Sequence, residues 1–291
     1  DGHVRQGDAL LDPLTLAASL GGRAIRSSAT ATQRLAAARQ RLFELAGAEK
    51  RVAQAELHRA EAALAQRLLG DGIDVLEAAV RELLNIGRDR DLFGRRHGLS
   101  ADQRARLKRL RRSLRELRDA RRKMRRDGAA PFFSFESHFG DVVSHGGFDL
   151  VTGNPPWVRA ERLSQHVRET LASRYSCWRS NGAAGFAHLP DLAVAFTERA
   201  FELARPAGTV ALLIPAKLAS SGYAEPLRQR LAQSTRIERA SPLPEPAARA
   251  FGAAVYPMAL VATRADPSEN QVTATALGPK FAAAVLPQQQ L

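Results

Sequence analysis

The spacing of leucine residues predicts a long helical segment between residues 29 and 127. Apolar side chains recur there at intervals of three, four and seven residues with alanine between them, which is the spacing of one helical face. The recurring residues are Leu35, Leu42, Leu45, Val52, Leu57 and Leu64. The Gly-Asp-Gly sequence at residues 70–72 predicts a break, after which residues 74–86 are again amphipathic. A third helix is predicted from Arg104 to Arg126, behind an N-cap at Ser100.

The pattern changes after residue 128 to short apolar runs that alternate with helical stretches. Strands are predicted at residues 148–153, 209–215, 236–240 and 254–263, and helices at residues 191–204 and 224–233. Residues 158–190 are polar and contain Gly and Asn-Gly breakers, which predict a loop. Alternation of this kind is typical of an α/β sheet.

Residues 1–28 show a third pattern, with a strand remnant near Val4, a turn at Gly7-Asp8 and a short apolar segment that ends at Pro13. This resembles a βα loop of a nucleotide-type fold. We therefore expect three segments. Residues 1–28 and 128–291 belong to one sheet domain, and residues 29–127 form a helical, basic insertion. The chain does not begin with methionine, and we expect it to be a piece of a longer polypeptide.

Composition narrows the class of protein. The net charge of +13 and the isoelectric point near 11.0 favour a polyanionic partner, although arginine-rich composition also reflects a GC-rich genome. Because Cys177 is the only cysteine, a disulfide framework and an all-cysteine metal site are excluded. Cys177 lacks a His-containing motif and is expected to be a bystander rather than a nucleophile. No apolar run is long enough to span a membrane, and we expect a cytoplasmic protein that holds no metal.

The sequence Asn154-Pro155-Pro156-Trp157 carries the candidate chemistry, because it directly follows the strand predicted at residues 148–153. An exocyclic or amide nitrogen is a poor nucleophile until its lone pair leaves conjugation. The side-chain oxygen of Asn154 and the carbonyl oxygen of Pro155 would accept its two N–H groups. Two prolines restrict the backbone and keep these acceptors preorganised. The motif therefore predicts a site that methylates an amino group.

Trp157 would offer a stacking face for a planar group that has been lifted out of a duplex. Asn-Pro and Pro-Pro are also ordinary turn signals, so the four residues alone do not decide the function. The context adds weight, because an apolar run followed by Gly153 and the motif is typical of the carboxyl end of a parallel strand. Ligands of open α/β folds bind at that edge.

With these residues, the chain resembles the gamma-class N6-adenine DNA methyltransferases, in particular the large type IIG restriction-modification and phage-defence methylases. Residues 7–11 are similar to the third motif of that family, residues 148–157 to the fourth, and residues 191–196 to the fifth. Residues 208–218 are similar to the sixth motif, and Phe251 with the strand after it is similar to the eighth. The family's Gly-rich first motif and acidic second motif have no counterpart here, and the insertion at residues 29–127 is long.

The resemblance implies a Rossmann-like class I methyltransferase sheet, partial in this chain, with an inserted helical hairpin. It implies S-adenosylmethionine as cofactor, bound in part by Asp8, Asn154 and Asp191. Asn154, Pro155, Pro156 and Trp157 would be catalytic, and Trp157 and Phe251 would bind the flipped base. The implied partners are double-stranded DNA and subunits of a restriction or defence system.

Two other functions stay open. One is methylation of a protein glutamine or of structured RNA, since both use an Asn-Pro-Pro-aromatic sequence for the same lone-pair reason. The other is a non-catalytic helical or DNA-binding module that serves assembly of a defence complex. Residues Arg104–Arg126 bear on the choice, with thirteen Lys or Arg against two acids. This helix is expected either to face the DNA backbone or to be the solvated surface of a hairpin.

Overall fold

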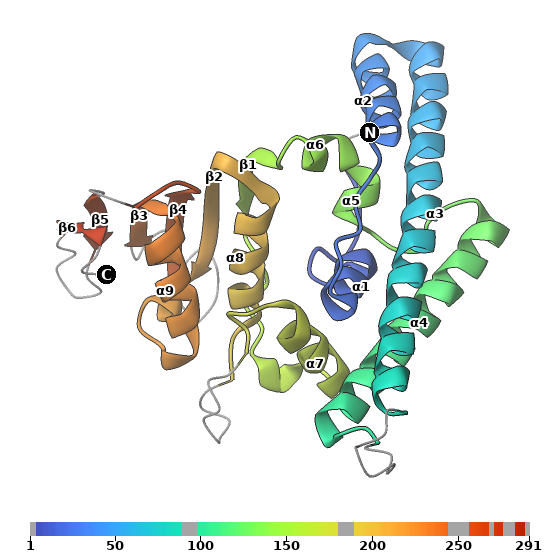
Figure 1. Ribbon diagram of the computed structural model, residues 1–291. Helices are drawn as coiled ribbons and strands as arrows, with labels where there is room; N and C mark the ends of the chain where they lie inside the picture. The colour runs from blue at the N-terminus through green and yellow to red at the C-terminus, as the bar shows by residue number, and fades with distance from the viewer. Residues whose placement is uncertain are drawn as a thin grey trace. The chain divides into compact units, whose positions relative to one another are not determined.

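The computed structural model describes residues 4–88, 98–179, 189–243, 256–267, 271–275 and 283–288. The chain forms two compact units, Asp1–Ser144 and His145–Leu291. Figure 1 shows that the first unit is helical and that the second is built on a sheet. Among the described residues, none of the helices combines the length and the apolar character that crossing a bilayer requires.

The first unit is organised around one long helix, α3 (Gly47–Ile86). Helices α1 (Pro13–Gly21), α2 (Ala29–Glu44) and α4 (Ala101–Asp127) pack against α3, as Figure 1 shows, and the short helices α5 (Phe135–His138) and α6 (Gly140–Ser144) complete the unit. Its core is rich in leucine from all four longer helices, including Leu14, Leu35, Leu57, Leu68, Leu76 and Leu110. Burial of these side chains, at about 1.5–3 kcal/mol each, is the main source of the unit's stability.

The predicted break at residues 70–72 is wrong, because α3 continues through both glycines. Each glycine costs about 1 kcal/mol relative to alanine in a helix, but Gly72 allows a close approach. A Cβ atom at Gly72 would lie 3.1 Å from Leu117 Cδ1 and 3.3 Å from Ile25 Cδ1. Packing therefore outweighs helix propensity here. The actual break lies between α2 and α3, where Leu45 is extended and Gly47 has a φ of 59°.

The predicted start of α4 is confirmed. The Ser100 side chain accepts a hydrogen bond from the Gln103 backbone N–H, and the Gln103 side chain accepts one from the Ser100 N–H. This reciprocal cap satisfies two backbone donors that the helix cannot pair internally. At the other end, Gly128 adopts a left-handed conformation with a φ of 74°, and its N–H donates to the Met124 carbonyl. Sequence signals therefore fix both ends of α4.

The strand remnant predicted near Val4 does not form, since residues 4–6 have no regular structure. The following turn is held by packing and by capping. A Cβ atom at Gly7 would lie 2.0 Å from Phe133 Cβ, so only glycine fits there. Asp12 caps α1 through bonds from the Leu14 and Thr15 backbone N–H groups. Residues 4–12 are thereby fixed on the helical unit.

The second unit contains a six-stranded sheet with the order β1-β2-β4-β3-β5-β6. The strands are β1 (Phe148–Gly153), β2 (Ala204–Pro215), β3 (Arg236–Pro242), β4 (Pro257–Thr263), β5 (Gln271–Thr275) and β6 (Ala283–Pro287). The pairs β1–β2 and β3–β5 are parallel, whereas β2–β4, β3–β4 and β5–β6 are antiparallel. Helix α8 (Leu192–Leu203) contacts β1 and β2, and helix α9 (Glu225–Ser234) contacts β3 (Figure 1). The unit also contains helix α7 (Gln165–Arg174).

The mixed α/β fold expected for the sheet domain is confirmed, and the helical unit precedes β1 in the chain. Two local expectations are wrong. Residues 158–190 are not wholly loop, because they contain α7 behind an N-cap at Ser164. The apolar run at residues 148–153 is typical of a buried strand, but β1 is not buried, and Leu150 is 58% exposed. The reason is topological, since β1 is the terminal strand of the described sheet and has a neighbour on one side alone among the described strands.

Gly147 sets the entry into β1. It has a φ of 122°, and a Cβ atom there would lie 2.3 Å from the Leu203 carbonyl oxygen. Only glycine combines that conformation with that approach. The end of α8 and the start of β1 are therefore in direct contact, and the motif strand has a fixed starting point.

Candidate functional site

The predicted motif lies at the carboxyl edge of the parallel pair β1–β2. Strand β1 ends at Gly153, and Asn154 directly follows it, while β2 ends at Pro215. Asn154 is exposed, whereas Pro155 is buried. The buried proline ring anchors the turn, and the amide of Asn154 is accessible to a ligand. This is the edge at which open α/β sheets bind their ligands.

Trp157 is tied to the second strand of this pair. Its indole N–H donates to the Leu213 carbonyl oxygen at 3.4 Å, and its half-buried ring packs against the core of the second unit. The hydrogen bond fixes the orientation of the ring. The part of the ring that remains accessible is thus presented in a defined position beside the motif.

Asp191 lies beside the loop that follows the motif. The Ala160 N–H donates to the Pro190 carbonyl at 3.1 Å, and the Leu192 N–H donates to the Val158 carbonyl at 2.8 Å. These two bonds join residues 158–160 to residues 190–192, and we call them the loop clamp. Asp191 itself is buried and caps α8 through a 2.9 Å bond from the Ala193 N–H. Its observed role is to position the loop and the start of α8.

The electrostatics of the clamp are set by burial. Burial raises the pKa of Asp191 above its usual range, while the bond from the Ala193 N–H and the charge of Arg159 act in the opposite direction. A raised carboxyl pKa means that ionised Asp191 is stabilised less here than in water. The backbone N–H groups and Arg159 partly offset this effect of burial.

Two further side chains stand at this edge that the sequence alone did not single out. The guanidinium carbon of Arg159 lies 6.0 Å from the centre of the Tyr223 ring. Tyr223 belongs to a short 3-10 helix, Gly222–Ala224, that follows β2. Burial, with the charge of Asp191, raises the pKa of Tyr223, so its hydroxyl keeps its proton. The sequence could have indicated Tyr223 by its position shortly after the second strand of the parallel pair, because residues that follow both strands lie at the carboxyl edge of the sheet.

Asp8 belongs to the first unit, and its role there is local. One oxygen, Oδ1, accepts bonds from the Leu10 N–H at 2.8 Å and the Leu11 N–H at 3.0 Å. Asp8 is exposed, so its second oxygen is accessible. The other predicted residue, Phe251, lies outside the described residues. The structure thus brings together Asn154, Trp157 and Asp191 within the second unit.

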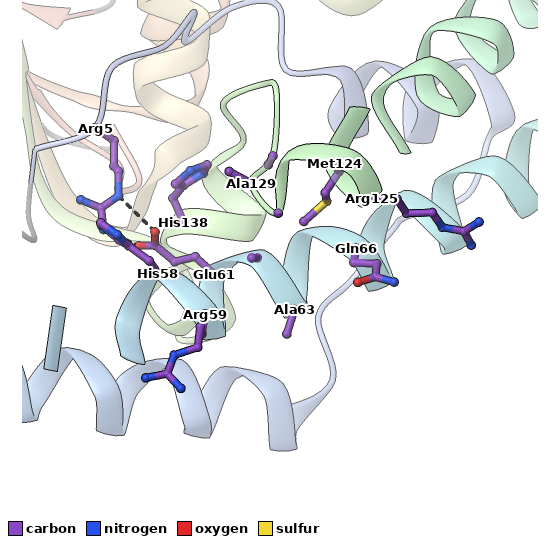
Figure 2. Close-up of a pocket in the computed structure, with 13 residues that line it drawn as sticks. Arg5, His58, Arg59, Glu61, Ala63, Gln66, Met124, Arg125, Ala129 and His138 are labelled. Carbon is purple, nitrogen blue, oxygen red and sulfur yellow. Dashed lines mark hydrogen bonds and ion pairs between the residues drawn. The ribbon is translucent and has the colours of Figure 1, made fainter. Parts of the chain in front are cut away.

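A pocket of about 740 Å³ lies in the first unit and is distinct from the predicted residues. It lies between α3, the end of α4 and the segment before α1. Figure 2 shows Arg5 joined to Glu61 across one wall, with His58, Arg59 and His138 nearby. The Arg5–Glu61 pair is 2.6 Å apart, and its two side chains are 12% and 8% exposed. This buried pair fastens the N-terminal segment to α3.

Cys177 is buried beside a carboxylate in the second unit. Burial, with the charge of Glu198, raises the pKa of the Cys177 thiol to about 11. A thiol with this pKa is almost wholly protonated near neutral pH, which supports its assignment as a bystander. Glu198 is the centre of this region and accepts hydrogen bonds from Ser176, Cys177 and Arg230.

Cys177 is expected to react slowly with a thiol reagent in the folded protein. At pH 8, a pKa of about 11 in place of 9.0 lowers the thiolate fraction about 100-fold, and burial slows access further. The rate of colour release from a disulfide reagent measures this, with protein unfolded in urea as the control. Equal rates in the folded and unfolded protein would contradict the burial and the raised pKa.

A family model described as Eco57I restriction-modification methylase matches residues 44–244, which is more than half of the chain. The chain belongs to this family. The match includes all of α3 and α4, the motif after β1 and the clamp residues. A search among curated proteins finds no match to the chain.

This member of the Eco57I family is similar to several solved structures, three of which follow. A modification subunit of a type I restriction enzyme from Vibrio vulnificus YJ016 is 13% identical with a TM-score of 0.33, over 82% of this chain and 59% of that one. The type IIL restriction-modification enzyme MmeI in complex with DNA is 14% identical with a TM-score of 0.34, over 94% and 43%. A class I S-adenosylmethionine-dependent methyltransferase from Listeria monocytogenes is 12% identical with a TM-score of 0.33, over 90% and 92%. The chain thus spans 59% and 43% of the length of the first two proteins.

Proposed function

We propose that this restriction-modification methylase transfers a methyl group from S-adenosylmethionine to adenine N6 in DNA, in restriction or phage defence. One observation carries the proposal. Asn154 is exposed at the carboxyl edge of the parallel β1–β2 pair, directly before a buried proline that fixes the turn. The restriction-modification family gives DNA as the substrate class. Subunits of a restriction or defence system are the other proposed partners, and the cytoplasm is the proposed location.

The proposed chemistry needs no covalent enzyme intermediate. The Asn154 Oδ1 atom and the Pro155 carbonyl oxygen accept the two N–H groups of the target amine, which draws its lone pair out of conjugation with the ring. The lone pair then forms the N–C bond while the methyl–sulfur bond breaks, and the amine afterwards loses one proton to solvent. Preorganised acceptors are effective because they do not have to reorient during the reaction.

S-adenosylmethionine is the methyl donor of this class of methylase, and its sulfonium supplies an activated methyl group. The residues present offer acceptors that suit its amine and hydroxyl groups. Asp8 has one oxygen fixed by two backbone N–H groups and is exposed, so its other oxygen can accept a donor from the cofactor. Asp191 would act on the cofactor side mainly by holding the loop that carries Asn154.

Trp157 and Phe251 are proposed to hold the extruded base, with Trp157 against its face and Phe251 at its edge. The hydrogen bond from the Trp157 indole N–H to Leu213 supports the first part, because a ring held in one orientation can stack without losing further freedom. Base extrusion is required, since the amine of a paired adenine cannot reach an active-site pocket from within the duplex.

Replacing Trp157 with alanine is expected to weaken productive DNA binding about tenfold or more, because base–aromatic stacking contributes roughly 1–3 kcal/mol. The signal of a 2-aminopurine at the target position measures extrusion in the full-length protein. It should rise on binding the wild type and rise less with Trp157→Ala. Trp157→Phe keeps a stacking face and serves as the control. An unchanged probe signal with the wild type would argue against extrusion.

The proposed function is tested directly by the position of the transferred methyl group. The full-length protein is incubated with duplex DNA and S-adenosylmethionine labelled in the methyl group, and the DNA is digested to nucleosides. N6-methyladenine is the expected product. Label on cytosine N4 would correct the target base. Label on protein or RNA in place of DNA would overturn the proposal in favour of a different methylase.

A further inference from the structure

The charged surface of α4 is separate from the surface that packs. The seam of α4 is buried against the rest of the helical unit and consists of Leu107, Leu110, Leu114, Leu117 and Met124. This seam fixes the rotation of α4 about its own axis, because turning the helix would expose the leucines. The direction of every other side chain on α4 is therefore set by sequence position.

Seven cations line one face of α4, and we call them the basic stripe. They are Arg104, Lys108, Arg111, Arg115, Arg118, Arg122 and Arg126, and all seven are exposed. Successive members are three or four residues apart. At about 100° per residue they fall within about 80° of arc and extend over about 33 Å. The two acids between its ends, Glu116 and Asp119, lie outside this arc.

Three members of the stripe have an acidic partner. Arg118 pairs with Glu77 of α3 at 2.7 Å, Arg126 pairs with Asp127 at 2.7 Å, and Arg122 pairs with Asp119. The Arg118 and Glu77 side chains are 45% and 34% exposed, and pairs this accessible contribute little to stability. Their arginine side chains can therefore leave the carboxylate partners and bind another anion. Lys108, Arg111 and Arg115, the second to fourth members of the stripe, have no ion pair among the described residues.

We propose that the basic stripe binds the phosphate backbone of duplex DNA without reading its sequence. Duplex DNA carries one negative charge per about 1.7 Å of axis, so a straight row of cations meets several phosphates at once. The stripe is straight, lies on one helix and is exposed, and those features match a regular polyanion better than a folded acidic protein. The inference rests on the proposed function only in the choice of DNA as ligand. The stripe would hold DNA on the methylase independently of the motif.

The test compares two triple variants of the full-length protein. The stripe variant is Lys108→Gln, Arg111→Gln and Arg115→Gln. The matched control is Arg106→Gln, Arg109→Gln and Lys123→Gln, three exposed cations of the same helix that point about 100° or more from the centre of the stripe. Both variants remove three positive charges, and Gln has nearly the helix propensity of Arg and Lys. Far-ultraviolet circular dichroism checks that both keep the fold.

Fluorescence anisotropy with a duplex that lacks any target site gives the affinity at a series of salt concentrations. The slope of log affinity against log salt falls by about 0.9 for each phosphate that the protein no longer neutralises. The stripe variant should therefore have a slope that is smaller by about two to three, and the control should keep the wild-type slope. If the two variants have equal slopes, the proposal that the basic stripe binds DNA is wrong, however far both slopes differ from that of the wild type.

The same proteins separate the stripe from the proposed function. In a single turnover with saturating DNA, the stripe variant should methylate at the wild-type rate, because its substitutions lie in the helical unit and not in the motif. If the salt slope falls in the stripe variant and not in the control, and the wild type transfers no methyl group, the function is contradicted and the stripe is supported. Methyl transfer with no difference between the two variants' slopes would contradict the stripe alone.

Discussion

Replacing Asn154 with alanine in the full-length protein is expected to lower the rate of methyl transfer about 10² to 10³-fold. The substitution removes one of the two acceptors that would draw out the lone pair of the amine. Since Asn154 is exposed and follows the last residue of β1, the fold should not change. Single-turnover methylation at saturating DNA and cofactor measures the chemical step, and thermal unfolding checks the fold.

Gln165→Ala provides the matched control for Asn154→Ala. It also removes an exposed side-chain amide, but it does so on α7, where the Gln165 amide bonds to Glu169 within the same helix. Its rate should stay within a few-fold of the wild type. If Asn154→Ala methylates as fast as Gln165→Ala, the lone-pair mechanism is wrong. If Asn154→Ala instead raises KM and leaves kcat unchanged, Asn154 binds the substrate and the transition state equally well.

Replacing Glu198 with alanine is expected to destabilise the second unit by about 3 kcal/mol. The Glu198 carboxylate is 2% exposed and joins three segments of the unit. It accepts bonds from the Ser176 N–H at 3.0 Å, the Ser176 hydroxyl at 2.8 Å, the Cys177 N–H at 2.9 Å and Arg230 Nη1 at 2.6 Å. Alanine leaves these donors without their acceptor. The destabilisation would reach α9 through Arg230.

Urea unfolding followed by tryptophan fluorescence measures this effect, because both tryptophans, Trp157 and Trp178, belong to the second unit. Glu198→Gln keeps one acceptor oxygen and should cost less than Glu198→Ala. Glu225→Ala removes an exposed carboxylate from α9 and should change stability by less than about 1 kcal/mol. A Glu198→Ala midpoint equal to that of Glu225→Ala would contradict the role given to the buried carboxylate.

Local signals in the sequence predicted the elements whose causes are local. The capping residues at Ser100 and Gln103 fix the start of α4, and Asp191 caps α8 where the helix was expected. The motif after β1 was found because an apolar run ends there. These features depend on residues within one turn of helix or one strand, which a single chain displays directly.

The features that the sequence did not predict depend on distant residues. The helix α3 continues through Gly72 because Leu117 and Ile25 approach it from other segments. The exposure of β1 follows from the order of strands in the sheet. Tyr223 joins the candidate site because β2 ends beside β1, although Trp157 and Tyr223 are far apart in the chain. No spacing of residues encodes such neighbours.

Because of the loop clamp, the length of the segment between Ala160 and Pro190 does not determine the position of the Asn154 amide. Two backbone hydrogen bonds hold the two ends of the segment between Ala160 and Pro190 next to each other. Lengthening a closed segment costs little, since each doubling adds only about 0.6 kcal/mol of closure entropy. Evolution can therefore vary this segment among methylases, for example to change what it touches, without moving Asn154.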